Sequence, residues 1–198
     1  HRDLHSFPTR RSSDLVLDGF TITAGNADDY RRGGGLNNTN SGLRIQSCTF
    51  LRNSAYAGGG LYNEGSDSVI VDCSFVENRA TDIPGGGGLR TLNSSISLFR
   101  SQFQGNYAQY SGGGLFSDGS VSARIVSNCI FRANTANYGG GVFVNHCVST
   151  LSNCLFTANA SKYGGGAIHS RWQDSALILI NSTLSTNIAT DETGGAIY

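Results

Sequence analysis

Four of the five cysteines recur at one position of a repeating pattern, which makes them the first candidates for chemistry. They are Cys48, Cys73, Cys129 and Cys154, and Ser101 and Ser182 occupy the same position in two further copies. Such thiols could form two disulfides, Cys48–Cys73 and Cys129–Cys154, or a thiolate metal site. The alternative is a ladder of small buried side chains, because free Cys packs as a small hydrophobic residue and parallel side chains fit disulfide geometry poorly. The pattern favours buried thiols, with neither a metal nor another cofactor.

Acidic residues are the second candidates, because enzymes that cleave polysaccharides use converging carboxylates, either as acid and base or around Ca²⁺. Here the acids are scattered: Asp28 and Asp29 lie near the start, Asp82 further on and Asp191 near the end. Asp82 and Asp191 share a repeat position but lie four copies apart. We identify no catalytic residue, and polysaccharide cleavage remains an alternative because loops from different positions could still converge.

Tyrosines form the third group. Tyr56, Tyr110, Tyr138 and Tyr163 each stand one or two residues before a glycine triplet. A strip of exposed aromatic rings could stack on sugar rings, which predicts glycan binding. Such rings also commonly cover a bend and pack on one another. Both readings stay open on the sequence alone.

The element that must position all of these residues is a repeat of 25–29 residues. Each copy reads I/L-x-x-C/S-x-F-x-x-N-x-A, followed by a short loop, a glycine triplet and an apolar residue. A fixed period of this length is typical of a solenoid, in which one unit is stacked on its neighbours. Cys48 and Phe50 alternate with Thr49, which is the period of a strand with one buried face. The glycine element opens a further extended piece: Gly60–Leu61 in one copy and, by this alignment, Gly166–Ala167 in another.

Strands of this kind, wound once per repeat, predict an all-β parallel β-helix of about seven coils with two or three strands in each. Equivalent residues of successive coils then lie about 4.8 Å apart and form ladders. One ladder is predicted to be the spine of the core: Phe50, Phe75, Phe103, Phe131 and Phe156, with Leu184 at its end. A second is predicted at a bend, where Asn tolerates the left-handed conformation and its amide can bond the backbone or a stacked amide: Asn53, Asn78, Asn106, Asn134, Asn159 and Asn187.

This pattern resembles the right-handed parallel β-helix repeats of the pectin-lyase-like superfamily. More narrowly, it resembles the polymorphic outer-membrane protein family, whose repeats pair F-x-x-N with G-G-A-I/L/V. The first motif begins at each of the five ladder phenylalanines, and Gly-Gly-Ala-Ile begins at Gly165 and Gly194. Most other copies read Gly-Gly-Gly-Leu. The resemblance implies a non-catalytic, structural or adhesin-like region of a secreted or cell-surface protein, associated with the outer membrane. A polysaccharide lyase or glycoside hydrolase and a glycan-binding module are the alternatives.

Two other repeat families fit less well. The leucine-rich repeat shares the frame L-x-x-L-x-L-x-x-N, but it places an apolar residue two positions after the Asn, where this chain has Ala, and it lacks the glycine triplet. The calcium-binding nonapeptide repeat needs an Asp at G-G-x-G-x-D spacing, and no Asp follows these glycines in that way.

The two ends of the chain need separate treatment. Residues 1–15 look like the in-frame translation of a sequencing adapter, so we assign the native part to residues 16–198 as one β-helix domain. Residues 194–198 stop inside a repeat. We therefore expect truncation at the C-terminus and also at the N-terminus.

Charge narrows the choice of partners. The sequence holds fourteen basic and fourteen acidic side chains, so no basic field exists to attract nucleic acid. No apolar run approaches the roughly 20 residues of a membrane-spanning helix. Surface glycans or proteins of a host or of the environment are the expected partners.

Overall fold

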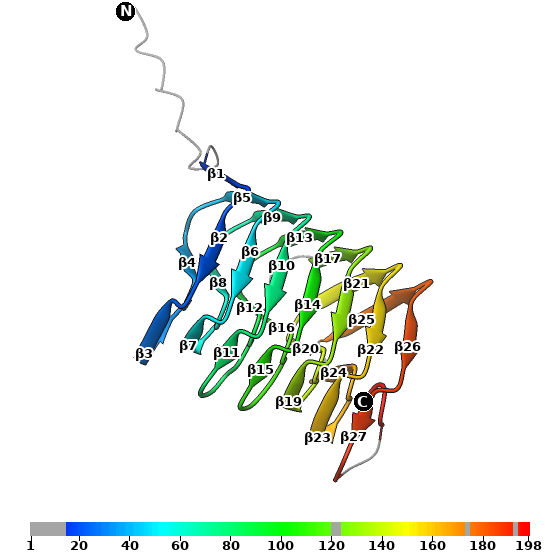
Figure 1. Cartoon of the computed structure of the whole chain (residues 1–198). Coiled ribbons are helices and arrows are strands. Elements are labelled where there is room, and N and C mark those ends of the chain that lie inside the picture. Colours follow the sequence, from blue (N-terminus) through cyan, green and yellow to red (C-terminus); the bar gives the residue numbers. More distant parts are fainter. Residues whose placement is uncertain (1–14, 120–123, 173–174, 192–193) are drawn as a thin grey trace, which may run out of the picture.

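The computed structural model describes residues 15–119, 124–172, 175–191 and 194–198, and these residues form a parallel β-helix (Figure 1). Each coil passes through four short strands, and every strand pairs in parallel with the equivalent strand of the next coil. Within the described ranges no helix is present, and so no helix there could cross a membrane. The all-β solenoid predicted from the repeat is confirmed, with three seven-stranded sheets and one six-stranded sheet.

The four sheets, which we name A to D in the order in which a coil visits them, run along the helix axis. Sheet A contains β1 (Leu15–Asp18), β5 (Leu43–Gln46), β9 (Ser68–Val71), β13 (Ile96–Phe99), β17 (Arg124–Ser127), β21 (Val148–Ser152) and β25 (Ala176–Ile180). Sheet B contains β2 (Thr21–Thr23), β6 (Thr49–Leu51), β10 (Ser74–Val76), β14 (Gln102–Gln104), β18 (Ile130–Arg132), β22 (Leu155–Thr157) and β26 (Thr183–Ser185). Leu15, in the segment predicted to be adapter-derived, pairs with Leu43, and residues 1–14 lie outside the described part.

Sheets C and D complete each coil. Sheet C contains β3 (Asn26–Arg32), β7 (Ser54–Ala57), β11 (Arg79–Ala80), β15 (Tyr107–Ala108), β19 (Thr135–Tyr138), β23 (Ala160–Gly164) and β27 (Ile188–Ala189). Sheet D contains β4 (Leu36–Thr39), β8 (Leu61–Glu64), β12 (Leu89–Leu92), β16 (Leu115–Asp118), β20 (Val142–Asn145) and β24 (Ile168–Arg171). The prediction of two or three strands per coil was too low, because a single residue is enough to turn the chain from one strand into the next.

These single-residue bends explain the spacing of the repeat. Between sheets A and B the turning residue is left-handed, as Ser47 is with a φ of 51°, and between sheets B and C Arg52 does the same with a φ of 53°. The left-handed conformation is costly for residues other than Gly. Here the cost is offset by backbone hydrogen bonds to the next coil, which Ser47 and Arg52 donate to Val71 and Val76 at 3.1 and 3.0 Å.

The glycine triplets turn the chain between sheets C and D, and their three positions have different reasons to be glycine. In the triplet before β8, Gly58 has a φ of 65°. A methyl group on Gly59 would lie 2.5 Å from the carbonyl oxygen of Arg79 in the next coil, and one on Gly60 would lie 3.1 Å from the ring of Phe75. Only the first position needs positive φ, and the other two need close approach between coils.

The predicted alignment of the last triplets was wrong by one residue. Val142 pairs with Ile168, so Ala167 occupies the third glycine position and not the first position of the strand. Inward apolar side chains of sheets A, B and D form one continuous buried cluster. Buried polar side chains such as Asn63, Ser68 and Thr91 lie beside it and hydrogen-bond to one another or to neighbouring coils.

Candidate functional site

The ladder phenylalanines lie inside the solenoid on sheet B. Consecutive ring centroids are 4.8, 4.6, 4.8 and 4.9 Å apart from Phe50 to Phe156, and the ring planes differ by no more than 9°. All five side chains are fully buried. Stacked rings at the coil spacing bury a large apolar area and fix the register of one coil on the next. These residues are therefore unavailable for contact with a ligand.

The ladder asparagines line the bend between sheets B and C. The amide nitrogen of Asn106 donates to the oxygen of Asn134 at 2.9 Å and to the carbonyl of Phe75 at 2.8 Å, while its own oxygen accepts from Asn78 at 3.0 Å. The same bonds link Asn53, Asn78, Asn106, Asn134, Asn159 and Asn187. The expected left-handed conformation was misplaced, because it falls on the preceding residue, such as Arg52, and not on the Asn.

The ladder cysteines lie at the bend between sheets A and B, with their sulfur atoms inside. Cys73 Sγ lies 3.2 Å from the carbonyl oxygen of Val71 and 3.7 Å from that of Ile45 in the preceding coil. Burial raises the pKa of Cys73 to about 11 and that of Cys129 to about 12, and it also raises the pKa of Cys154. The structure records these cysteines and Cys48 as free thiols. Protonated, enclosed thiols are poor nucleophiles and poor metal ligands.

The four predicted tyrosines do not form one strip. Tyr138 and Tyr163 are neighbours, with ring centroids 5.2 Å apart, whereas Tyr56 pairs with Tyr30 at 5.3 Å. Tyr110 is 37 % exposed and lines a groove together with Tyr138. Two of the four therefore face a common surface, and that surface is shaped by residues of other coils.

The acids that we considered are not gathered in the described part of the chain. Asp82 accepts a hydrogen bond from the backbone of Ile83 at 2.7 Å, and Asp191 lies 3.9 Å from Lys162. The side chains of Asp28 and Asp29 are outside the described residues. No group of three or more His, Cys, Asp or Glu side chains that could hold a metal ion occurs among the residues that the structure describes.

The richest constellation lies on the outer face of sheet D, where sequence reasoning had placed nothing. The second residue of each strand points away from the core and forms an aromatic and cationic ladder: Tyr62, Arg90, Phe116, Phe143 and His169. The Arg90 guanidinium lies 4.8 Å from the Phe116 ring, and the rings from Phe116 to His169 stack at 5.2 and 5.0 Å. All five side chains of this ladder are buried, with exposed fractions between 1 % and 5 %.

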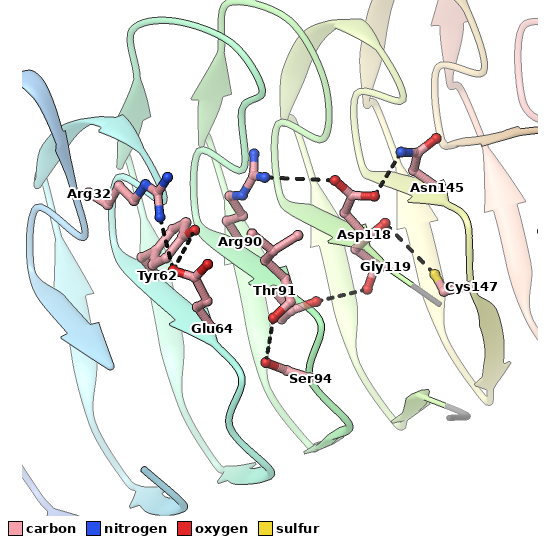
Figure 2. A network of polar contacts seen from close by, with 12 residues as sticks. Arg32, Tyr62, Glu64, Arg90, Thr91, Ser94, Asp118, Gly119, Asn145 and Cys147 are labelled. Carbon is pink, nitrogen blue, oxygen red and sulfur yellow. Dashed lines mark hydrogen bonds and ion pairs between the residues drawn. The ribbon is translucent and has the colours of Figure 1, made fainter. Parts of the chain in front are cut away.

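Beside the ladder, the fourth residues of β8, β16 and β20 belong to a polar network (Figure 2). Glu64 accepts hydrogen bonds from Arg32 at 2.9 Å and from Tyr62 at 3.2 Å. Asp118 lies 3.7 Å from Arg90 Nη2 and accepts a hydrogen bond from Asn145 Nδ2 at 2.8 Å.

Two members of this network are incompletely bonded. Arg90 is 5 % exposed, and its Nε and Nη1 atoms have no hydrogen-bond partner; Asn145 Oδ1 is likewise buried without a partner. Burial lowers the pKa of Arg90 and that of His169. Because the pKa of His169 lies below the ordinary value for histidine, its side chain is neutral at physiological pH. The outer face of sheet D thus contains buried polar atoms without hydrogen-bond partners, and His169 on this face carries no charge.

A groove of about 270 Å³ lies over this face and follows the axis across several coils. Phe116 and Phe143 lie along it, together with Tyr110 and Tyr138, and Trp172 contributes from the segment after β24. Asn145 and Arg171 supply polar groups, and no Asp or Glu is among the described residues that line the groove. The arrangement can hold an elongated ligand that has both apolar faces and polar groups.

Sequence reasoning missed this groove for a physical reason. Most of its residues lie outside the positions that recur in every coil, so the repeat pattern gives them no common signal; Tyr110 and Tyr138 are the two that the sequence had indicated. One signal was available: the single Trp of the chain follows directly on Arg171, at the end of β24. The search for repeated positions passed over it.

Comparison with known proteins gives one match. Residues 153–171 match the Chlamydia polymorphic membrane protein repeat. This segment contains β22, β23 and β24 and carries both F-x-x-N, at Phe156 and Asn159, and G-G-A-I, from Gly165 to Ile168. No curated protein and no solved structure gives a significant match. The chain is thus a parallel β-helix that carries a repeat like those of the Chlamydia polymorphic membrane proteins.

Proposed function

We propose that this β-helix is a non-catalytic region of a secreted or cell-surface protein, where it serves as a structural or adhesin-like stalk. The matched repeat type and the solenoid fold both fit a surface or outer-membrane β-helix protein. A stack of coils is rigid along its axis because each coil is hydrogen-bonded to its neighbours throughout its strands. Its length grows with each added repeat, which suits a stalk.

The observation that carries this proposal is the use to which the repeated residues are put. The Phe, Asn and Cys ladders face the interior or bond to neighbouring coils, and they are enclosed. The positions that recur in each coil therefore build the rod. A repeated catalytic or metal-binding position would instead have to contact a substrate or an ion.

Surface labelling tests the proposal. Antibodies raised against the purified β-helix are applied to intact cells that express the parent gene, with a cytoplasmic protein as the matched control. We expect labelling without permeabilisation, and loss of that labelling after brief protease treatment of intact cells. Labelling that requires permeabilisation, as for the control, would contradict a surface location.

Polysaccharide hydrolysis is a second candidate, and one observation favours it. Glu64 and Asp118 share a register on the outer face of sheet D with Leu92 between them, so two carboxylates lie on one face two coils apart. Inverting glycosidases separate their carboxyl groups by about 6.5–9.5 Å. Both carboxylates are, however, already engaged by protein groups, including Arg32 and Asn145.

Reducing-sugar release from a panel of plant, bacterial and animal polysaccharides separates these two functions. We expect no release by the wild-type chain. Release that is lost in both Glu64→Gln and Asp118→Asn would establish hydrolysis and overturn the non-catalytic assignment. Glu77→Gln, in an exposed ion pair with Arg52 away from sheet D, is the matched control for the loss of one carboxylate.

A further inference from the structure

The groove over sheet D has walls from different coils. Ile83 and Pro84 come from the segment between β11 and β12, Tyr110 from the equivalent segment one coil later, and Trp172 from the far side. Successive coils advance about 4.8 Å along the axis. A ligand in this groove therefore runs parallel to the axis and meets a different side chain at each step.

Two aromatic side chains of the groove, Trp172 and Tyr110, are exposed, whereas Phe116 and Phe143 are buried. Trp172 is 56 % exposed, yet its ring stacks on His146 at 5.4 Å and the Arg171 guanidinium lies 4.9 Å from its centroid. The Tyr110 ring is 37 % exposed and has no ring partner among the described residues. The exposed Tyr110 ring at one wall of the groove is suited to packing against the apolar C–H face of a sugar ring.

Asn145 offers a hydrogen-bond acceptor to the groove. Its Nδ2 donates to Asp118 at 2.8 Å, which fixes the orientation of the amide because a carboxylate can only accept. Figure 2 shows the nitrogen facing Asp118 and the oxygen pointing away from it. That Oδ1 atom is buried and has no partner. Buried acceptors are ordinarily satisfied, and a ligand hydroxyl supplies the missing donor.

Arg171 gives the groove its charge. Its side chain is exposed and forms no ion pair with a described carboxylate, and the described residues that line the groove include no acid. A guanidinium presents a planar fork of donors that matches a carboxylate. The groove thus offers a flat ring for a sugar face, an acceptor for a hydroxyl and a fork for a carboxylate.

We propose that this groove binds an acidic oligosaccharide, with a sugar ring against Tyr110, a hydroxyl donating to Asn145 and a sugar carboxylate on Arg171. The inference rests on the proposed function, because it names the class of partner that a surface stalk would hold. It is distinct from the four-tyrosine strip expected from the sequence, since Tyr56 and Tyr163 do not line this groove.

The single tryptophan makes the site directly observable, because emission excited at wavelengths that tyrosine does not absorb comes from Trp172 alone. The probes are a hyaluronan tetrasaccharide and the same tetrasaccharide with its carboxyl groups reduced to alcohols. We expect a saturable change of emission with the acidic probe and at least about tenfold weaker binding of the reduced one, since a charge-assisted bond is lost. No saturable change with either probe overturns the proposal, and equal affinity for both overturns its acidic specificity.

Three variants, each checked for an unchanged thermal transition, locate the binding. Arg171→Gln is expected to weaken the acidic probe to the affinity of the reduced one, and Asn145→Ala to weaken both. Tyr30→Ala is the off-groove control, since Tyr30 is 81 % exposed and pairs with Tyr56. Loss of binding in the control, or full binding in Arg171→Gln, overturns the assignment. Surface labelling of cells together with absent sugar binding would reject this inference and leave the proposed function standing.

Discussion

The inner face of sheet B and the outer face of sheet D are built on the same coils but follow opposite rules. On sheet B one residue type repeats, so that five Phe rings stack at nearly constant distance. On sheet D the second position of successive strands changes from Tyr62 to Arg90, Phe116, Phe143 and His169. Along the Asn ladder each side-chain amide is hydrogen-bonded to the next. On the outer face of sheet D, by contrast, buried atoms of Arg90 and Asn145 have no hydrogen-bond partner.

This difference separates residues that hold the rod together from residues that can select a partner. A ladder works only if each rung matches the next, so selection for stability makes the rungs alike. A binding groove needs different groups at different places, so its residues differ along the axis. In this solenoid repetition is a signature of structure, and we propose that binding chemistry lies where the repetition is broken.

Asn106→Ala should produce the largest effect, because it removes a rung of the inner ladder. The change deprives the carbonyl of Phe75 of its donor and both the backbone and the side-chain nitrogens of Asn78 of their acceptor. Each buried group left unsatisfied costs about 1–3 kcal/mol. We expect the free energy of unfolding to fall by about 3–5 kcal/mol, measured by urea denaturation.

The matched control is Asn37→Ala, because Asn37 is exposed on the outer side of β4. A surface substitution of this kind changes stability by no more than about 0.5 kcal/mol. Similar losses for Asn37 and Asn106 would contradict the distinction between the inner ladder and the surface.

An intermediate effect is expected where the inner ladder itself departs from repetition. A methyl group on Gly114 or Gly141 would lie 3.0 or 3.2 Å from the Phe ring of the next coil. Ala167 holds the equivalent position, and the next coil has Leu184 in place of Phe. The two exceptions therefore compensate each other: the smaller side chain leaves room for the methyl group.

Leu184→Phe alone should lower the free energy of unfolding by about 1–3 kcal/mol, because the added ring crowds Ala167. Combining it with Ala167→Gly should recover most of that loss. A double-mutant cycle in urea measures the coupling, for which we expect roughly 1–2 kcal/mol. Simple additivity of the two changes would show that the residues do not sense each other.

The sequence was sufficient to predict the solenoid, because Phe50 and its equivalents recur once in each repeat. Within a copy, residues such as Cys48 and Phe50 alternate with the period of a strand. It did not predict the fourth strand, because a bend made by one residue such as Ser47 or Arg52 has no composition signal. It misaligned Ala167, because an apolar residue directly after the glycine triplet Gly164–Gly166 looks like the start of a strand. It missed Asn145 and Arg171, because their roles depend on which coil they occupy.

The outer face should show its character in the pH dependence of stability. His169 is 3 % exposed and stacks between Phe143 at 5.0 Å and Tyr198 at 4.8 Å, with Tyr138 edge-on at 5.4 Å and Arg171 nearby. Burial lowers the pKa of His169 in the folded chain, whereas the unfolded chain has the ordinary value of about 6.5. Below pH 6.5 the unfolded state therefore binds more protons, and stability falls as the pH falls.

His169→Phe removes this proton while keeping an aromatic ring in the stack. The expected effect is smaller than either change to the inner ladder: the variant should lose less stability than the wild type between pH 7.5 and pH 5. Urea denaturation of both proteins at each pH measures it. At pH 7.5 the histidine is neutral in both states, so the difference there reports packing and the lost contact of His169 Nδ1 with the Gly164 carbonyl oxygen at 3.3 Å. The additional difference in stability between the two proteins at pH 5 reports the protonation of His169. If the wild type and His169→Phe lost the same stability between pH 7.5 and pH 5, the folded chain would hydrate a charged His169. The outer face of sheet D would then not be buried as described.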